Sequence, residues 1–317
     1  MEKRALGKTG LEIAPLVLGG NVFGWTADEQ TSFAVLDAFV DQGFNAIDTA
    51  DAYSRWVSGN EGGESETIIG KWLKANPAKR DQVAIFTKVG SDMGGVGHKG
   101  LSPRWIAQAV EDSLKRLQTD RIDLYFSHWP DPDTPHEETL GAYETLLKAG
   151  KIRSIGASNL DAGQLTAALN AAQTKSLPRY EVLQPEYNLY DRAKLDGPLL
   201  DLCMREGLGV VTYFSLASGF LSGKYRSEAD LSKSKRGGGV GKYLDARGMK
   251  VLGALDQVAA NQSAEQAEIA LAWIMARRGV TAPIASATSV TQVESFAKAA
   301  NLTLSADDMK ALDDAST

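Results

Sequence analysis

Residues 137–173 read EETLGAYETLLKAGKIRSIGASNLDAGQLTAALNAAQ, and this stretch contains one complete repeating unit of the expected fold. Glu137–Ala149 has apolar residues at helical spacing and is closed by Gly150, a residue type that favours helix ends. Ile152–Ala157 is an apolar run of strand length, and Asp161–Gln173 is again helical. A strand between two helices indicates parallel strands joined by helical crossovers.

The same alternation runs through the rest of the chain. Seven further strands are expected, at Pro15–Leu18, Asn45–Asp48, Val83–Lys88, Ile122–Ser127, Val182–Glu186, Gly209–Tyr213 and Thr281–Ile284. Further helices are expected at Thr26–Val40 with Thr26 as the N-cap, Ser102–Leu117, Leu195–Arg205, Ala264–Arg278 and Val290–Ala300, and from Ser305 onward.

This count and order predict an α/β fold, a (β/α)₈ TIM barrel, with an N-terminal β-hairpin and an extra C-terminal helix. No linker rich in Pro or Ser divides the chain, so we expect residues 1–317 to form one domain. A doubly wound open sheet is the alternative architecture.

Composition excludes several classes of protein. The formal net charge of −6 argues against a general nucleic-acid-binding surface. The N-terminus lacks an apolar signal core and no apolar run is long enough to cross a membrane, so we expect a cytoplasmic protein without membrane partners. The single cysteine, Cys203, allows no disulfide within the chain. His98, His128 and His136 do not have metal-ligand spacing, and we expect no metal.

Reactive residues gather at the carboxyl ends of the expected strands, where barrels of this kind carry their active sites. Each could have a structural role alone, but their occurrence at the same end of successive strands favours a shared site. They are Asp48, Lys88, His128, Ser158, Asn159, Glu186 and Tyr213.

Three of these residues, together with the nearby Tyr53, suit the reduction of a carbonyl group. Tyr53, in the loop after Asp48, is a candidate proton donor, and we expect a cation at Lys88 to lower its pKa. Asp48 can hold the ammonium group, and His128 can hydrogen-bond the substrate oxygen. The hydride must come from a cofactor, because no side chain supplies one.

Several motifs resemble the aldo-keto reductase family, within the broad branch that includes potassium-channel beta subunits. They are DTADAY (48–53), FTKVG around Lys88, YFSHW around His128, GKIRSIGASN (150–159) and LQPEYN (183–188). RALGKTGLEI near the start and GFLSGKY later in the chain match as well. The resemblance implies a nicotinamide-dependent reductase with Tyr53, Asp48, Lys88 and His128 as the catalytic tetrad.

The resemblance also assigns the cofactor contacts. Ser158, Asn159 and Gln184 match positions that bind the nicotinamide carboxamide, and Tyr213 matches the residue that stacks on the ring. The pyrophosphate loop corresponds to Ser215, Leu216, Ser218, Gly219, Leu221 and Lys224. The adenosine half is expected near Ser286, Thr288, Gln292 and Ser295.

Two segments depart from the family pattern. Residues 283–295 carry no Arg or Lys to bind a 2′-phosphate, so the family favours NADPH while NADH use stays open. The loop after Tyr53 is longer than usual and carries Trp56. Together with Phe23, Trp25 and Trp129, it is expected to wall the pocket of a small-molecule carbonyl substrate.

Other interpretations remain open from the residues. Residues 227–247 hold Lys233, Lys235, Arg236, Lys242 and Arg247, and form either a solvated loop or a basic flap over phosphates. A glycosidase would use Asp48 and Glu186 as its carboxylate pair, which leaves Lys88 and Tyr53 without roles. A non-catalytic nucleotide-binding regulatory subunit is a third class.

Overall fold

The computed structural model describes residues 1–317, and its centre is a closed barrel of eight parallel strands. In barrel order these are β10 (Ala282–Ala285), β3 (Val17–Gly19), β4 (Ala46–Asp48), β5 (Ala84–Val89), β6 (Leu124–Ser127), β7 (Ile155–Ser158), β8 (Val182–Gln184) and β9 (Gly209–Thr212). Strand β10 pairs with both β3 and β9, which closes the ring. The TIM barrel prediction is confirmed, and the open-sheet alternative is wrong.

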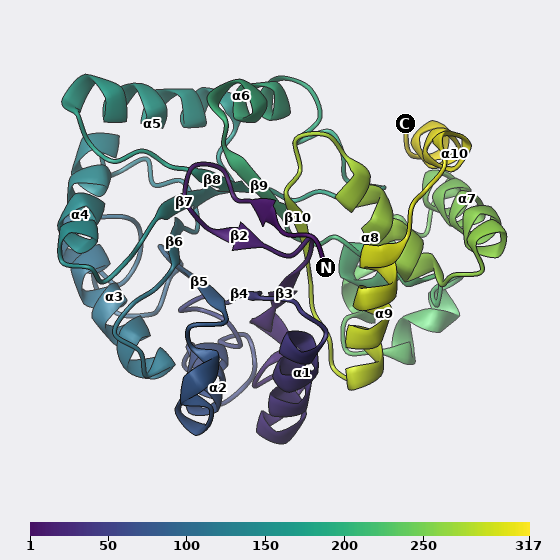
Figure 1. Ribbon diagram of the computed structural model, residues 1–317, viewed down its shortest axis with the longest axis horizontal. Helices are drawn as coiled ribbons and strands as arrows, with labels where there is room; N and C mark the ends of the chain where they lie inside the picture. Colours follow the sequence, from purple (N-terminus) through teal and green to yellow (C-terminus); the bar gives the residue numbers. More distant parts are fainter.

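Helices surround the barrel on all sides (Figure 1). They are α1 (Glu29–Asp41), α2 (Glu64–Ala75), α3 (Pro103–Leu117), α4 (His136–Lys148), α5 (Ala162–Lys175), α6 (Pro198–Glu206), α7 (Ala246–Gln262), α8 (Gln266–Ala276), α9 (Val290–Asn301) and α10 (Ala306–Ser316). None combines the length and apolar character needed to cross a bilayer. Helices α2 and α7 were not expected from the sequence.

Two expected helix starts are wrong. Helix α1 begins after Asp28, whose carboxylate accepts a hydrogen bond from the Thr31 N–H at 2.8 Å, so Asp28 rather than Thr26 is the N-cap. Helix α6 begins at Pro198 instead of Leu195, because proline fits the first helical position, where no N–H partner is needed.

An N-terminal hairpin of β1 (Arg4–Ala5) and β2 (Glu12–Ile13), as expected, covers one mouth of the barrel. Leu6 and Ile13 pack into the apolar cluster inside the barrel, which includes Phe86 and Phe126. A Cβ on Gly156 would overlap the Phe126 ring, so glycine lets this aromatic residue fill the interior. The hairpin and this cluster close the amino-terminal end and leave the other end for a site.

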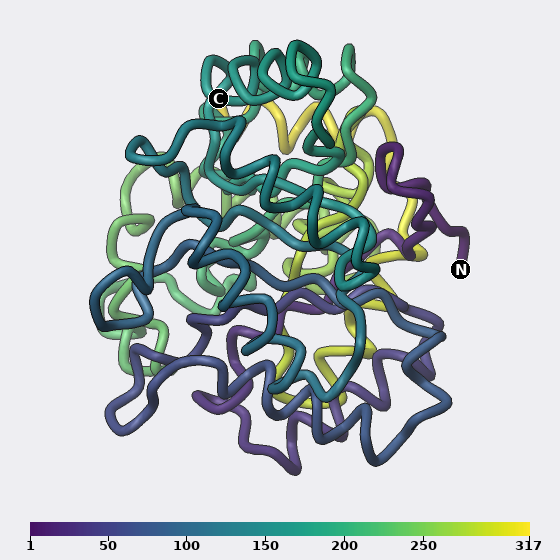
Figure 2. Tube along the Cα trace, turned by 90° about the vertical axis from the view of Figure 1, so that its left-hand side faces the viewer, coloured from purple at the N-terminus to yellow at the C-terminus, as the bar shows by residue number.

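The connections at the carboxyl ends of the strands lie on the side away from the hairpin (Figure 2). The longest follows β9 and contains short 3₁₀ turns, η3 (Ala217–Ser222), η4 (Glu228–Lys233), η5 (Gly237–Gly239) and η6 (Gly241–Tyr243). Val240 and Tyr243 of this segment are buried, so it is packed onto the barrel. We call residues 227–247 the flap.

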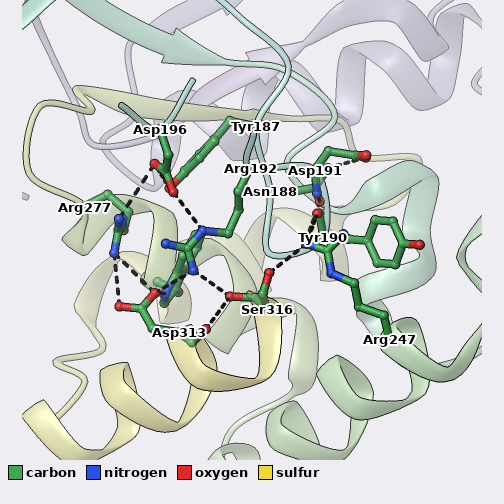
Figure 3. Close-up of polar contacts among 11 residues, drawn as sticks. Tyr187, Asn188, Tyr190, Asp191, Arg192, Asp196, Arg247, Arg277, Asp313 and Ser316 are labelled. Atoms are coloured by element: carbon green, nitrogen blue, oxygen red, sulfur yellow. Dashed lines mark hydrogen bonds and ion pairs between the residues drawn. The ribbon is translucent and has the colours of Figure 1, made fainter. Parts of the chain in front are cut away.

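The C-terminal helix α10 is held by a polar network (Figure 3). Asp313 accepts hydrogen bonds from Arg192 at 3.0 Å, Arg277 at 3.2 Å and the Trp273 indole at 3.1 Å. Arg192 also binds Asp196, which accepts a bond from Tyr187 just beyond β8. The network therefore ties the C-terminal helix to the connection that follows β8.

Candidate active site

Asp48, Tyr53 and Lys88 meet at the carboxyl end of the barrel. Asp48 ends β4 and Lys88 lies in the neighbouring β5, with their side chains 1 % and 0 % exposed. The Lys88 ammonium donates to Asp48 Oδ2 at 2.6 Å, to the Tyr53 hydroxyl at 2.8 Å and to the Thr49 carbonyl at 2.8 Å. All three ammonium protons are thus used, which fixes the ammonium beneath the tyrosine oxygen.

The pKa of Tyr53 lies well above its usual range. Burial is the main cause, and the Asp48 carboxylate, 3.3 Å from the hydroxyl, adds to it. The net shift is thus upward, opposite to the lowering that we expected from Lys88, and burial is its largest cause. Burial also lowers the pKa of Lys88, while Asp48 raises it. Tyr53 therefore stays protonated at neutral pH, the form that a general acid needs.

His128 follows β6 and faces Tyr53, with the two ring centroids 6.1 Å apart. Burial, helped by the Lys88 charge, lowers the pKa of His128 well below its usual value, so the imidazole is neutral. Its Nδ1 lies 3.0 Å from the Ser91 hydroxyl, which accepts a bond from the Trp129 indole N–H at 3.2 Å. When the Ser91 hydroxyl donates a hydrogen bond to Nδ1, the ring hydrogen is on Nε2, which can then donate a hydrogen bond of its own.

A cleft of about 1500 Å³ opens over this cluster. Asp48, Tyr53 and His128 line it, and it extends from there past β8 and β9 to α9. The cleft thus joins a protonated phenol and a neutral imidazole to a long groove. Its size is sufficient for a dinucleotide-sized molecule together with a small substrate.

The residues expected to hold a nicotinamide ring form one connected polar floor. Gln184 donates to Asp48 Oδ1 at 2.9 Å, and Ser158 donates to the Gln184 carbonyl at 2.8 Å. Asn159 donates to the His128 carbonyl at 2.9 Å and accepts the Tyr213 hydroxyl proton at 2.6 Å. These amides and the Tyr213 ring suit a planar carboxamide-bearing ring, so the residues present fit the expected cofactor.

The sequence model of the Aldo/keto reductase family matches residues 15–317. The chain belongs to the aldo/keto reductase family. It is 34 % identical to the uncharacterized oxidoreductase YrpG of Bacillus subtilis, over 99 % of this chain and 95 % of that protein. The B. subtilis aldo-keto reductase YhdN is 33 % identical over 98 % and 92 % of the two chains.

A plant relative extends the comparison. A probable voltage-gated potassium channel subunit beta of Arabidopsis thaliana is 33 % identical, over 95 % of this chain and 92 % of that protein. The family and these relatives make this aldo/keto reductase an oxidoreductase that acts on small molecules.

The groove of this aldo/keto reductase contains all but one of the residues expected at the cofactor. Ser158, Asn159, Gln184, Tyr213, Ser215, Leu216, Ser218, Gly219, Lys224, Ser286, Thr288, Gln292 and Ser295 line the cleft. Leu221 does not, because its side chain is fully buried and its N–H is used by the Leu216 carbonyl at 3.2 Å. Ser218 and Gly219 have φ of 59° and 97°, which turns successive peptide groups in the loop after β9.

The expected substrate residues divide into two pairs. Trp56 and Trp129 line the cleft and are about half exposed, at 52 % and 48 %. Phe23 does not reach the cleft, because it is fully buried in the core. Trp25 is not part of the lining either and packs edge-on behind Trp56, with centroids 5.6 Å apart.

Several lining residues were not expected from the sequence. Asn21 accepts a bond from Ser286 at 2.5 Å, and Ser91 contacts His128. Glu265 and Glu268 also line the cleft. The sequence motifs identified residues at the ends of strands. These additional residues lie in the connections, whose paths depend on tertiary packing.

The glycosidase interpretation finds no support in the geometry of this aldo/keto reductase. Glu186 pairs with Lys194 at 2.6 Å and does not line the cleft. Asp48 is bound to Lys88 and Gln184. No group of three or more His, Cys, Asp or Glu is arranged to hold a metal.

Proposed function

We propose that this protein reduces aldehydes or ketones to alcohols with a nicotinamide cofactor, using Tyr53 as the general acid. The observation that carries the proposal is the Lys88 ammonium, which contacts both the Tyr53 hydroxyl and Asp48 at the floor of the cleft. Hydride transfer to a carbonyl carbon leaves negative charge on its oxygen, and a proton must reach that oxygen.

The residues divide this work between them. Tyr53 is protonated and gives its proton to the carbonyl oxygen, while Lys88, 2.8 Å away, stabilises the phenolate that forms. His128, kept neutral by burial, donates a hydrogen bond to the same oxygen and orients it. When bound, the reduced nicotinamide supplies the hydride. Tyr213, Asn159 and Gln184 would hold its ring against the carbonyl.

We propose NADPH as the preferred cofactor, because the family favours it and because one cation in the cleft could bind its 2′-phosphate. Lys298, in the last turn of α9, lines the same cleft as Thr288 and Ser289, so it could add a positive charge for a 2′-phosphate that accepts hydrogen bonds from their hydroxyls. Glu265 and Glu294 line this cleft as well and act against a phosphate. A Lys298→Ala variant should lose affinity for NADPH and keep its affinity for NADH in fluorescence titrations.

A substrate screen with both cofactors tests this function directly. We expect absorbance of the reduced nicotinamide to fall when aldehydes are added, with NADPH bound more tightly than NADH. No turnover with any aldehyde or ketone would contradict the activity. A preference for NADH greater than about tenfold, or ~1.4 kcal/mol, would contradict only the choice of cofactor.

A further inference from the structure

Three buried carboxyl groups lie around the carboxyl ends of β4 and β5, and two of them have a cation. Asp48 pairs with Lys88 at 2.6 Å. Glu66 of α2 is fully buried and pairs with Arg116 of α3 at 2.6 Å. The third carboxyl group belongs to Asp51, which is 1 % exposed and whose two oxygens have no hydrogen-bond partner.

The backbone places Asp51 next to the reacting residues. It lies two residues before Tyr53 in the connection after β4, and its N–H donates to the Lys88 carbonyl at 3.3 Å. Glu66 is tied to the same strand, because it accepts the Thr87 hydroxyl proton at 2.5 Å and Thr87 precedes Lys88 in β5. Any charge on Asp51 therefore lies close to the group that donates the proton.

The charges of this region balance without Asp51. Each of the two ion pairs is neutral, so an ionised Asp51 would be a buried negative charge without a partner. Such a charge is costly to bury, whereas a protonated carboxyl group carries none. Burial, followed by repulsion from Glu66, accordingly raises the pKa of Asp51 well above its usual value, although Arg116 and Lys88 lower it in part.

The hydroxyl groups around Asp51 give it no positive charge either. Tyr125 of β6 and Tyr143 of α4 are both fully buried. Burial is the main cause that raises the pKa of each, and charge on Asp51 raises it further. Both tyrosines therefore stay protonated, and the Tyr125 hydroxyl, like the Asp51 oxygens, has no hydrogen-bond partner.

We propose that Asp51 stays a neutral carboxylic acid at neutral pH and that its neutrality lets Tyr53 release a proton during reduction. This inference rests on the proposed function and adds to it a positioning residue that acts through Tyr53. When the O–H bond of Tyr53 breaks and its proton joins the substrate oxygen, Lys88 offsets the new phenolate charge. Asp51 keeps its own proton throughout. An ionised Asp51 would oppose the phenolate, since it raises the pKa of Tyr53 after the larger effects of burial, Asp48 and Tyr213.

Infrared spectroscopy tests the protonation of Asp51 without any substrate. The difference spectrum between the wild type and Asp51→Asn isolates the bands of this one carboxyl group. We expect the carbonyl band of a protonated acid at about pH 6, where an ordinary aspartate is ionised, and we expect this band to disappear as the pH rises. Carboxylate bands in its place at that pH would overturn the inference.

Rates of reduction test the coupling to Tyr53. The single-turnover rate of bound NADPH with one aldehyde is measured for the wild type and Asp51→Asn over the same pH range. The ratio of the variant rate to the wild-type rate should rise by about three- to tenfold as the acid band of the wild type disappears. A nearby like charge shifts a pKa by about one unit, and the rate follows part of that shift.

A constant ratio while the acid band disappears would overturn the inference, because a purely structural role changes the rate by the same factor at every pH. Asp51→Ala, a second neutral replacement, should show the same rise. The matched control is Asp308→Asn, at a carboxyl group of α10 that is 7 % exposed and accepts hydrogen bonds from Ser305 and Gln262. Its rate relative to the wild type should not change with pH.

The failure of the proposed function has a different outcome. If the wild type reduces no aldehyde or ketone, the activity is wrong, while the infrared spectrum still decides whether Asp51 holds a proton. The acid band would then uphold the neutral carboxyl group, and its absence would overturn the inference as well.

Discussion

Replacing Ser91 by alanine should lower kcat, because Ser91 directs the proton on the His128 ring. The Ser91 hydroxyl lies 3.0 Å from His128 Nδ1 and accepts the Trp129 indole proton at 3.2 Å. An indole nitrogen can only donate, so the hydroxyl of Ser91 remains free to donate a hydrogen bond to Nδ1. This favours the tautomer of His128 that carries its ring hydrogen on Nε2. In Ser91→Ala, nothing favours this tautomer, and part of the enzyme presents an acceptor to the carbonyl oxygen.

The size of the effect follows from one neutral hydrogen bond. Such a bond contributes about 0.5–1.5 kcal/mol, which corresponds to a fall in kcat of roughly two- to tenfold. Ser91 does not bind the substrate carbonyl in this account, so KM should change less than kcat. Steady-state rates with one aldehyde give both constants. Ser91→Thr, which keeps the hydroxyl, should retain most of the activity.

Three results would refute this reasoning. One is a Ser91→Ala enzyme with wild-type kcat, since the tautomer would then not depend on the serine. The other is a nitrogen NMR spectrum of the wild type that places the His128 proton on Nδ1. A loss confined to KM would also contradict it, because it would move the role of Ser91 to binding.

Three further predictions concern stability and the cofactor. Asp51 is 1 % exposed, and its carboxyl oxygens have no hydrogen-bond partners. Burial, followed by repulsion from Glu66, raises the pKa of this carboxyl well above the usual value. The stability of the protein with a protonated Asp51 is fully present below about pH 4 and is lost as pH rises, because the buried carboxyl resists ionisation. In thermal unfolding, the free energy of unfolding of Asp51→Asn should therefore rise relative to that of the wild type by up to about 1.4 kcal/mol per pH unit. A difference that does not change with pH would contradict this. Tyr213→Ala should weaken cofactor binding in a fluorescence titration far more than Tyr213→Phe, which keeps the ring, and equal losses would argue against stacking. Asp313→Asn should lower the free energy of unfolding by about 1–3 kcal/mol in urea, because it disturbs the hydrogen bonds from Arg192, Arg277 and Trp273. The exposed Asp314→Asn should change this free energy little, and equal effects would exclude the network of Figure 3 as an anchor.

The barrel could be predicted from the sequence because each strand is short, apolar and followed by polar residues. Helix α2 could not, since it begins after Gly63, whose φ is 83°, without a side-chain cap. Helix α7 follows the glycine-rich flap, where the composition favours a loop although Val240 and Tyr243 are buried.

The site divides in the same way. Asp48 and Lys88 lie within strands, so strand pairing alone brings them to one edge. The pKa of Tyr53 depends on the burial of its hydroxyl and on the nearby Asp48 carboxylate. The spacing of these residues in the sequence reveals neither. Phe23 and Trp25 lie in the connection that follows β3, which the sequence places near the mouth of the barrel. Side-chain packing, which the sequence does not show, places Phe23 in the core and Trp25 against Trp56.

The central claim is that the Tyr53 hydroxyl delivers the proton, and the Tyr53→Phe variant tests it most directly. Phenylalanine keeps the ring against Trp56 and removes only the hydroxyl that Lys88 contacts. The measurement is the single-turnover rate of oxidation of bound NADPH by an aldehyde, together with the Kd of NADPH. The account predicts a rate about 10²- to 10⁴-fold lower with the Kd unchanged. A Tyr53→Phe enzyme that turns over at the wild-type rate would contradict it.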